Sequence, residues 1–114
     1  MVQVNKGITC RISGTFISDD GTTLTSNPDT IVATLYELSS GTVINSRDKQ
    51  NVLNVNGGTC NSGVFVLFLG ASDNVILNSG RLSENHRLFL EWKYNNGTRN
   101  GNAYIDVTVI AVGR

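Results

Sequence analysis

Short segments in which apolar and polar side chains alternate recur along the chain, about ten residues apart. A period of two residues puts one set of side chains on each face of a β-strand, one buried and one in water. Helical periodicity is confined to residues 73–78, where Ser72 or Asp73 could cap a single turn. No segment could form the crossover helix that parallel strands need, so the pattern predicts an all-β, antiparallel fold.

Seven strands are expected from this pattern. Residues 64–69 are apolar at every position, so we expect this strand to be central and covered on both faces. Two Asn-Gly pairs within residues 95–101 favour a hairpin between the last two strands. About seven strands at this spacing favour an immunoglobulin-like β-sandwich, with a small barrel as the alternative. The expected strands are residues 8–13, with residues 14–17 as a candidate extension, 30–38, 42–47, 51–55, 64–69, 86–94 and 104–112.

A length of 114 residues predicts one domain. The alternation begins at Ile8, so residues 8–114 are expected to form that domain and residues 1–7 an extended N-terminal arm. Val2, Gln3, Val4 and Asn5 alternate in polarity and are the candidate assembly contacts, because such an arm could add a strand to a neighbour's sheet.

The charge balance argues against nucleic acid as a partner, because 9 basic residues match 9 acidic ones and no long run of like charge exists. Charged residues make up only 16% of the chain, which leaves a surface of amides and hydroxyls suited to contact with protein. The longest apolar stretch, residues 64–69, is too short to span a membrane, and residues 1–7 lack the core of a signal peptide. We therefore expect a soluble, unprocessed chain.

Few residues could carry catalysis or bind a metal. Cys10 and Cys60 are expected to be free thiols rather than a disulfide, since no signal peptide directs the chain to an oxidising compartment. Glu84 and His86 would face the same way on a strand, but one pair supplies too few ligands for zinc, and we expect His86 to lie at a strand entry or an interface. No enzyme activity and no cofactor are predicted.

Three other motifs have ordinary explanations. Asp19-Asp20-Gly21 and Asp73-Asn74 resemble fragments of calcium-binding loops, yet neither has the full ligand spacing, and turns explain both. Asn96-Gly97-Thr98 is a glycosylation sequon that the hairpin turn already accounts for.

Aromatic side chains could form a platform for sugars. The candidates are Tyr36, Trp92, Tyr94 and Tyr104. Trp92 and Tyr94 share the parity of Leu88 and Leu90, so these two are expected in the core.

The order of segments between residues 28 and 112 carries a family resemblance. In the first half the matching segments are Pro28-Asp29-Thr30, Ala33-Thr34-Leu35-Tyr36, Val43-Ile44-Asn45-Ser46-Arg47-Asp48, Gln50 and Val52-Leu53-Asn54. In the second half they are Glu84, His86-Arg87, Phe89, Glu91-Trp92-Lys93-Tyr94, Gly101 and Ile105-Asp106-Val107-Thr108-Val109. In these segments the chain resembles small immunoglobulin-like virion proteins of tailed bacteriophages.

This resemblance implies a structural component of the virion that is assembled in the host cytoplasm. A capsid decoration, or cement, protein is the leading expectation, and a neck or tail connector is the alternative. The implied partners are the major capsid protein or neck and tail proteins, with several copies of the chain in each particle. From the residues alone, a module that binds glycans or a cell-surface protein is the rival hypothesis.

Overall fold

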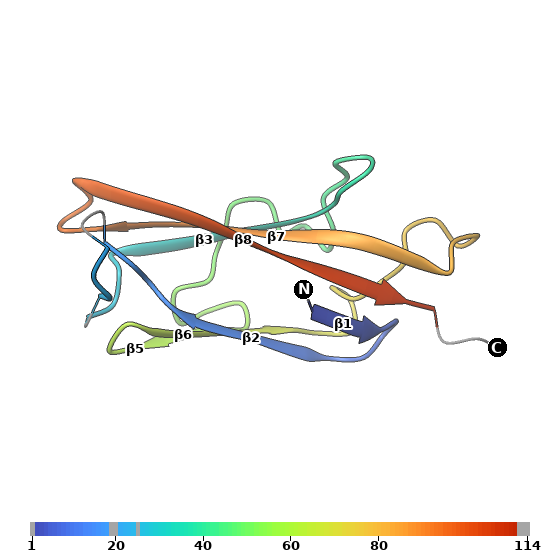
Figure 1. Ribbon diagram of the computed structural model, residues 1–114, viewed down its shortest axis with the longest axis horizontal. Coiled ribbons are helices and arrows are strands. Elements are labelled where there is room, and N and C mark those ends of the chain that lie inside the picture. Colours follow the sequence, from blue (N-terminus) through green and yellow to red (C-terminus); the bar gives the residue numbers. More distant parts are fainter. Residues whose placement is uncertain (1, 19–20, 25, 112–114) are drawn as a thin grey trace.

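The computed structural model describes residues 2–18, 21–24 and 26–111. These residues form an all-β, sandwich-like domain measuring 48 × 23 × 23 Å, and the strands lie in two layers (Figure 1). None of the described residues belongs to a helix that could cross a membrane. Within the described ranges the strands are β1 (Val2–Asn5), β2 (Cys10–Thr15), β3 (Thr30–Glu37), β4 (Gln50–Asn51), β5 (Gly58–Asn61), β6 (Val64–Leu69), β7 (Ser83–Tyr94) and β8 (Arg99–Ile110).

One layer is a sheet of five strands in the order β1-β8-β7-β3-β4, and the other is a sheet of three in the order β2-β6-β5. All neighbouring strands are antiparallel except β1 and β8, which run parallel. Figure 1 shows β3, β7 and β8 in one layer and β2, β5 and β6 in the other. The prediction of an all-β fold is therefore confirmed, and the expected antiparallel pairing is wrong for one described pair, β1 with β8.

The core fills the space between the two sheets, as the alternation predicts. The inward side chains of the central strands are buried. Trp92 is 8% exposed, which confirms its expected place in the core, and its ring centroid lies 4.8 Å from that of Phe16. Gly101 pairs with Trp92 across the hairpin, and a Cβ atom at Gly101 would approach the indole to 2.7 Å. The buried apolar set includes Ile12, Ile31, Ala33, Leu35, Phe65, Leu67, Leu69, Leu88, Leu90, Val107 and Val109.

The predicted hairpin of β7 and β8 is confirmed, but its turn is shorter than expected. Tyr94 pairs with Arg99, so the turn comprises residues 95–98. Asn95, Asn96 and Gly97 all have positive φ (56°, 58° and 78°), a conformation that Asn and Gly tolerate best. The second Asn-Gly pair lies within β8, where Gly101 leaves room for Trp92.

Between β3 and β6 the predicted strands at residues 42–47 and 51–55 are wrong. The first contributes only one bridge, between Val43 and Tyr36, and the second is reduced to the two residues of β4, Gln50–Asn51. Positive φ values at Asn45 (55°) and Ser46 (55°) turn the chain, so it cannot continue as a strand. β5 was not predicted either. Its alternate residues are buried, but its polar residues and Gly58 hide the alternation in the sequence.

Residues 70–80 form turns and no helix. The carboxylate of Asp73 accepts hydrogen bonds from the backbone N–H of Gly70 (2.8 Å) and from Arg47 (2.6 Å). The candidate cap therefore holds two chain segments together instead of starting a helical turn.

The N-terminal residues are not an arm standing clear of the domain. Val2, Gln3, Val4 and Asn5 form β1, and they pair with Val107, Thr108, Val109 and Ile110 of β8. Val4 is buried in the core. Removing its apolar side chain from water is favourable, which explains why this segment pairs with β8. Met1 lies outside the described residues.

Candidate interaction surfaces

The outer face of the three-stranded sheet carries an exposed apolar row. Val64, Val66 and Phe68 point away from the core on β6, and we call them the β6 outer row. Val64 and Phe68 are each 51% exposed, whereas Phe65, Leu67 and Leu69 on the same strand are buried. The central position of this strand is confirmed, but the expectation that both its faces are covered is wrong for the described part of the chain.

The neighbours of the β6 outer row are mostly small and uncharged. On β2, Arg11, Ser13 and Thr15 pair with Phe68, Val66 and Val64. On β5, Thr59 pairs with Val66 and Asn61 pairs with Val64. An apolar centre with a polar rim is the usual anatomy of a surface that binds another protein.

The outer face of the five-stranded sheet carries aromatic residues. Tyr36, Phe89 and Tyr104 lie on β3, β7 and β8, and Phe89 pairs directly with Tyr104. Together with Arg87 and Asp106 these residues form what we call the aromatic face. Of the four aromatic residues predicted as platform candidates, Trp92 and Tyr94 are buried and Tyr104 is 57% exposed.

An ion pair fixes the centre of the aromatic face. Arg87 donates from Nε to Oδ1 of Asp106 (2.8 Å) and from Nη2 to Oδ2 (3.1 Å). Its guanidinium carbon lies 3.8 Å from the centroid of the Tyr104 ring, a cation–π contact. The hydrogen bonds from Arg87 outweigh partial burial and hold the pKa of Asp106 below its usual value. Phe89 was not predicted as part of this surface. Its alternation with the buried residues Leu88 and Leu90 could have placed it on the outer face.

Glu84 and His86 face the same way, as predicted, but both are buried. Nε2 of His86 lies 2.9 Å from Oε1 of Glu84, whose carboxylate also accepts the backbone N–H groups of Leu77 (2.9 Å) and Asn78 (2.8 Å). His86 thus lies inside β7 and within the core, which excludes a place on an exposed interface. Among the described residues no cluster of three or more His, Cys, Asp or Glu side chains could hold a metal ion.

The other candidate residues lie apart from each other. Cys10 and Cys60 are both free, as predicted, and they lie on the two edge strands of the three-stranded sheet. Burial raises the pKa of both thiols, which makes them poor nucleophiles. Asp73 is engaged by Arg47, and the Asn96 sequon lies in the hairpin turn. Asp19 and Asp20 lie outside the described residues.

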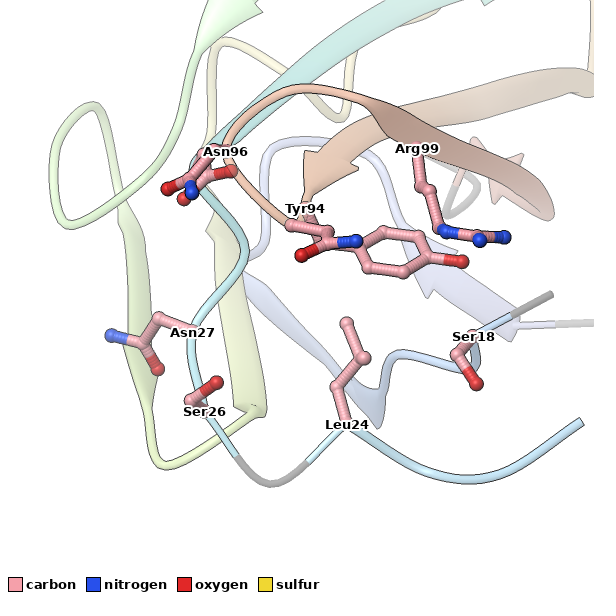
Figure 2. A pocket seen from close by; sticks show the side chains of 9 residues that line it. Ser18, Leu24, Ser26, Asn27, Tyr94, Asn96 and Arg99 are labelled. Carbon is pink, nitrogen blue, oxygen red and sulfur yellow. The ribbon is translucent and has the colours of Figure 1, made fainter. Parts of the chain in front are cut away.

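A cleft of about 700 Å³ lies at the hairpin end of the domain. The loop before β3 contributes Leu24 and Ser26 to it, and the hairpin contributes Tyr94 and Arg99. Figure 2 shows Leu24 next to the Tyr94 ring, with the Arg99 guanidinium near the phenol oxygen. The amide of Asn27 is used elsewhere: it donates to the carbonyl of Cys60 (2.9 Å) and accepts from the N–H of Gly63 (3.1 Å).

Comparison of the chain with models of known protein families, with curated proteins and with solved structures finds no significant match.

Proposed function

We propose that this chain is a non-enzymatic structural component of a tailed-bacteriophage virion, of the capsid decoration type, and that it docks by the β6 outer row. The exposed apolar row of Val64, Val66 and Phe68 carries the proposal. Soluble domains seldom place such a row along a central strand unless another protein covers it. The virion setting rests on the family resemblance.

The order of the strands supports an immunoglobulin-like domain. In that fold one sheet contains strands B, E and D in neighbouring positions, and the other contains G, F, C and C′. The order β2-β6-β5 corresponds to B-E-D, and β8-β7-β3-β4 corresponds to G-F-C-C′. Such a sandwich has two outward sheet faces, and both are available for contact with other proteins.

Docking on the β6 outer row would be driven by burial of apolar area. Fully burying a valine or phenylalanine contributes about 1.5–3 kcal/mol, so a side chain that is half exposed retains roughly half of that for a partner. Phe68 is the natural anchor, because it offers the largest apolar area of the row. Arg11 beside it supplies the only charge on the paired rim positions and would help to orient the partner.

The test compares Phe68→Ser with Leu82→Ser in purified phage particles. Leu82 is 81% exposed and lies outside both sheets, so its replacement controls for loss of an exposed apolar side chain. We expect Phe68→Ser to lower incorporation strongly and Leu82→Ser to leave it unchanged, with both proteins folded normally. Wild-type protein absent from purified particles would refute the virion assignment, and full incorporation of Phe68→Ser would refute the docking face.

Separated heads and tails distinguish the two positions in the particle. Protein recovered with heads supports decoration of the capsid, and protein recovered with tails supports a neck or tail connector.

The cleft at the hairpin end favours a second candidate function, a module that binds glycans or a cell-surface protein. In variable-type immunoglobulin domains the loops at one end of the sandwich form the binding site, and this cleft lies between two such loops. Ser26 and Arg99 offer hydroxyl and guanidinium groups of the kind that bind sugars. Binding on a glycan array that Arg99→Ala abolishes would support this function, and no binding to any glycan would exclude the sugar-binding form.

A further inference from the structure

We propose that the aromatic face binds a second copy of this chain through a two-fold, face-to-face contact. This inference concerns the sheet opposite to the β6 outer row and does not rest on the proposed virion function. The aromatic face offers Tyr36, Phe89 and Tyr104 around the ion pair of Arg87 and Asp106. Tyrosine, phenylalanine and arginine are enriched at protein interfaces, and tyrosine and arginine also among the residues that dominate binding.

The centre of the aromatic face is already ordered in the monomer. Two hydrogen bonds hold Arg87 to Asp106, and the guanidinium lies against the ring of Tyr104. A side chain that is fixed before binding loses little conformational entropy on binding, so more of the contact energy is retained as affinity. Tyr104 therefore has the properties of a rigid anchor, because it is exposed and yet fixed.

The charges along β7 select a second copy as the partner. After Ser83 at its start, the outward residues of β7 are Asn85, Arg87, Phe89, Glu91 and Lys93 in order. A two-fold axis that crosses the strands at Phe89 reverses this order in the second copy. Each Arg87 then lies over Glu91 of the second copy, and each Lys93 lies over an uncharged Asn85.

The neighbouring strands agree with the same axis. On β8, Tyr104 pairs with Phe89 and so lies near the axis, while Asp106 lies over Asn102 of the second copy. On β3, Tyr36 lies over Val32 of the second copy, because Thr34 is the residue that pairs with Phe89. No charged side chain of these three strands meets a like charge. A two-fold axis that runs along β7 would instead place Arg87 over Arg87 and Lys93 over Lys93, so the charges favour the axis across the strands over that one.

Sedimentation equilibrium over a concentration series tests the proposal. We expect wild-type protein to dimerise, and Tyr104→Ala and Glu91→Lys each to raise the dissociation constant by about tenfold or more. Glu91→Lys acts because it places a lysine over Arg87 of the second copy. Higher salt should weaken the wild-type dimer, since it screens the two Arg87–Glu91 contacts between the copies.

Phe68→Ser is the matched control, because it removes an exposed aromatic side chain from the opposite sheet. It should leave the dissociation constant unchanged, and Trp92 emission would verify that each variant is folded. Wild-type protein that stays monomeric up to about 1 mM would overturn the proposal. A dimer that resists Tyr104→Ala and Glu91→Lys but is lost in Phe68→Ser would overturn it as well.

Discussion

Replacing Asp73 by Asn should destabilise this domain far more than the same change at Asp106. Both carboxylates form two hydrogen bonds with an arginine, but the side chains of Arg47 and Asp73 are 9% and 2% exposed, against 27% and 22% for Arg87 and Asp106. The two variants have the same shape change and differ mainly in burial. They therefore separate the effect of burial from the effect of the pair itself.

The magnitude follows from what each change leaves behind. Asp73→Asn leaves the Arg47 guanidinium buried without a negative partner, which costs about 3–5 kcal/mol. It also weakens the junction at which Asn45 donates to Oδ1 of Asp73 (2.9 Å) and Gly70 donates to Oδ2 (2.8 Å). Asp106→Asn leaves Arg87 close to water, and partly exposed pairs of this kind contribute little, so this variant should lose much less stability. Domains have total stabilities of about 5–15 kcal/mol, so the first loss is a large share.

Urea denaturation followed by Trp92 emission measures both losses under identical conditions. We expect similar slopes and a much lower midpoint for Asp73→Asn than for Asp106→Asn. A loss below about 1 kcal/mol for Asp73→Asn, or equal losses for the two variants, would refute the reasoning from burial.

Three further outcomes follow from the core and its polar groups. Gly101→Ala should cost about 1–3 kcal/mol, because the added methyl group would lie 2.7 Å from the indole of Trp92. Trp92→Ala should cost about 3–5 kcal/mol. Urea melts followed by circular dichroism measure both losses, since Trp92→Ala removes the chain's one tryptophan. Cys10 and Cys60 should both react with a thiol reagent after unfolding without reductant, and protection of both would reveal a disulfide. Burial would raise the pKa of Glu84, but hydrogen bonds from His86, Asn78 and Leu77 outweigh it and lower that pKa. The stability that the ionised Glu84 carboxylate contributes is therefore complete above about pH 4.3 and is lost as the pH falls through its folded-state pKa. Urea melts of wild type and Glu84→Gln at a series of pH values test this. The same acid dependence in both proteins would contradict it.

Alternation in the sequence predicted the strands with the clearest contrast between faces. In β7 every second residue from Glu84 to Tyr94 is buried, and the parity that placed Trp92 and Tyr94 in the core was correct. The same rule failed for β5, because the buried residues Gly58 and Cys60 are small and alternate with the polar residues Thr59 and Asn61. β5 forms a strand because it pairs with β6, and the sequence of residues 58–61 alone holds no information about that partner.

The polar interior could not be predicted from local patterns. Arg47 and Asp73 are 26 residues apart in the sequence and meet only because two loops are brought together. The alternation of residues 2–5 predicted a strand added to a neighbour's sheet, and nothing in these residues indicated that the sheet would be the chain's own. The exposure of Phe68 could not be predicted either. An apolar side chain at every position of β6 indicates two covered faces, whereas the described residues cover only one.

The two proposed surfaces together predict how many copies each docking site would hold. Their strands lie in opposite layers, β6 in one and β3, β7 and β8 in the other (Figure 1), and the residues of each surface occupy the outward positions of those strands. A two-fold axis between two aromatic faces points the β6 outer rows of both copies in opposite directions, so only one copy of a dimer can dock on a given partner. The second copy would be held through the first and would present its own Phe68 outward. Tyr104→Ala should then lower the ratio of this chain to its partner in purified particles to about half, while docking itself persists, and Phe68→Ser should remove both copies. Densitometry of the particle proteins measures this ratio, and a ratio that Tyr104→Ala leaves unchanged would show that the two surfaces are not used together.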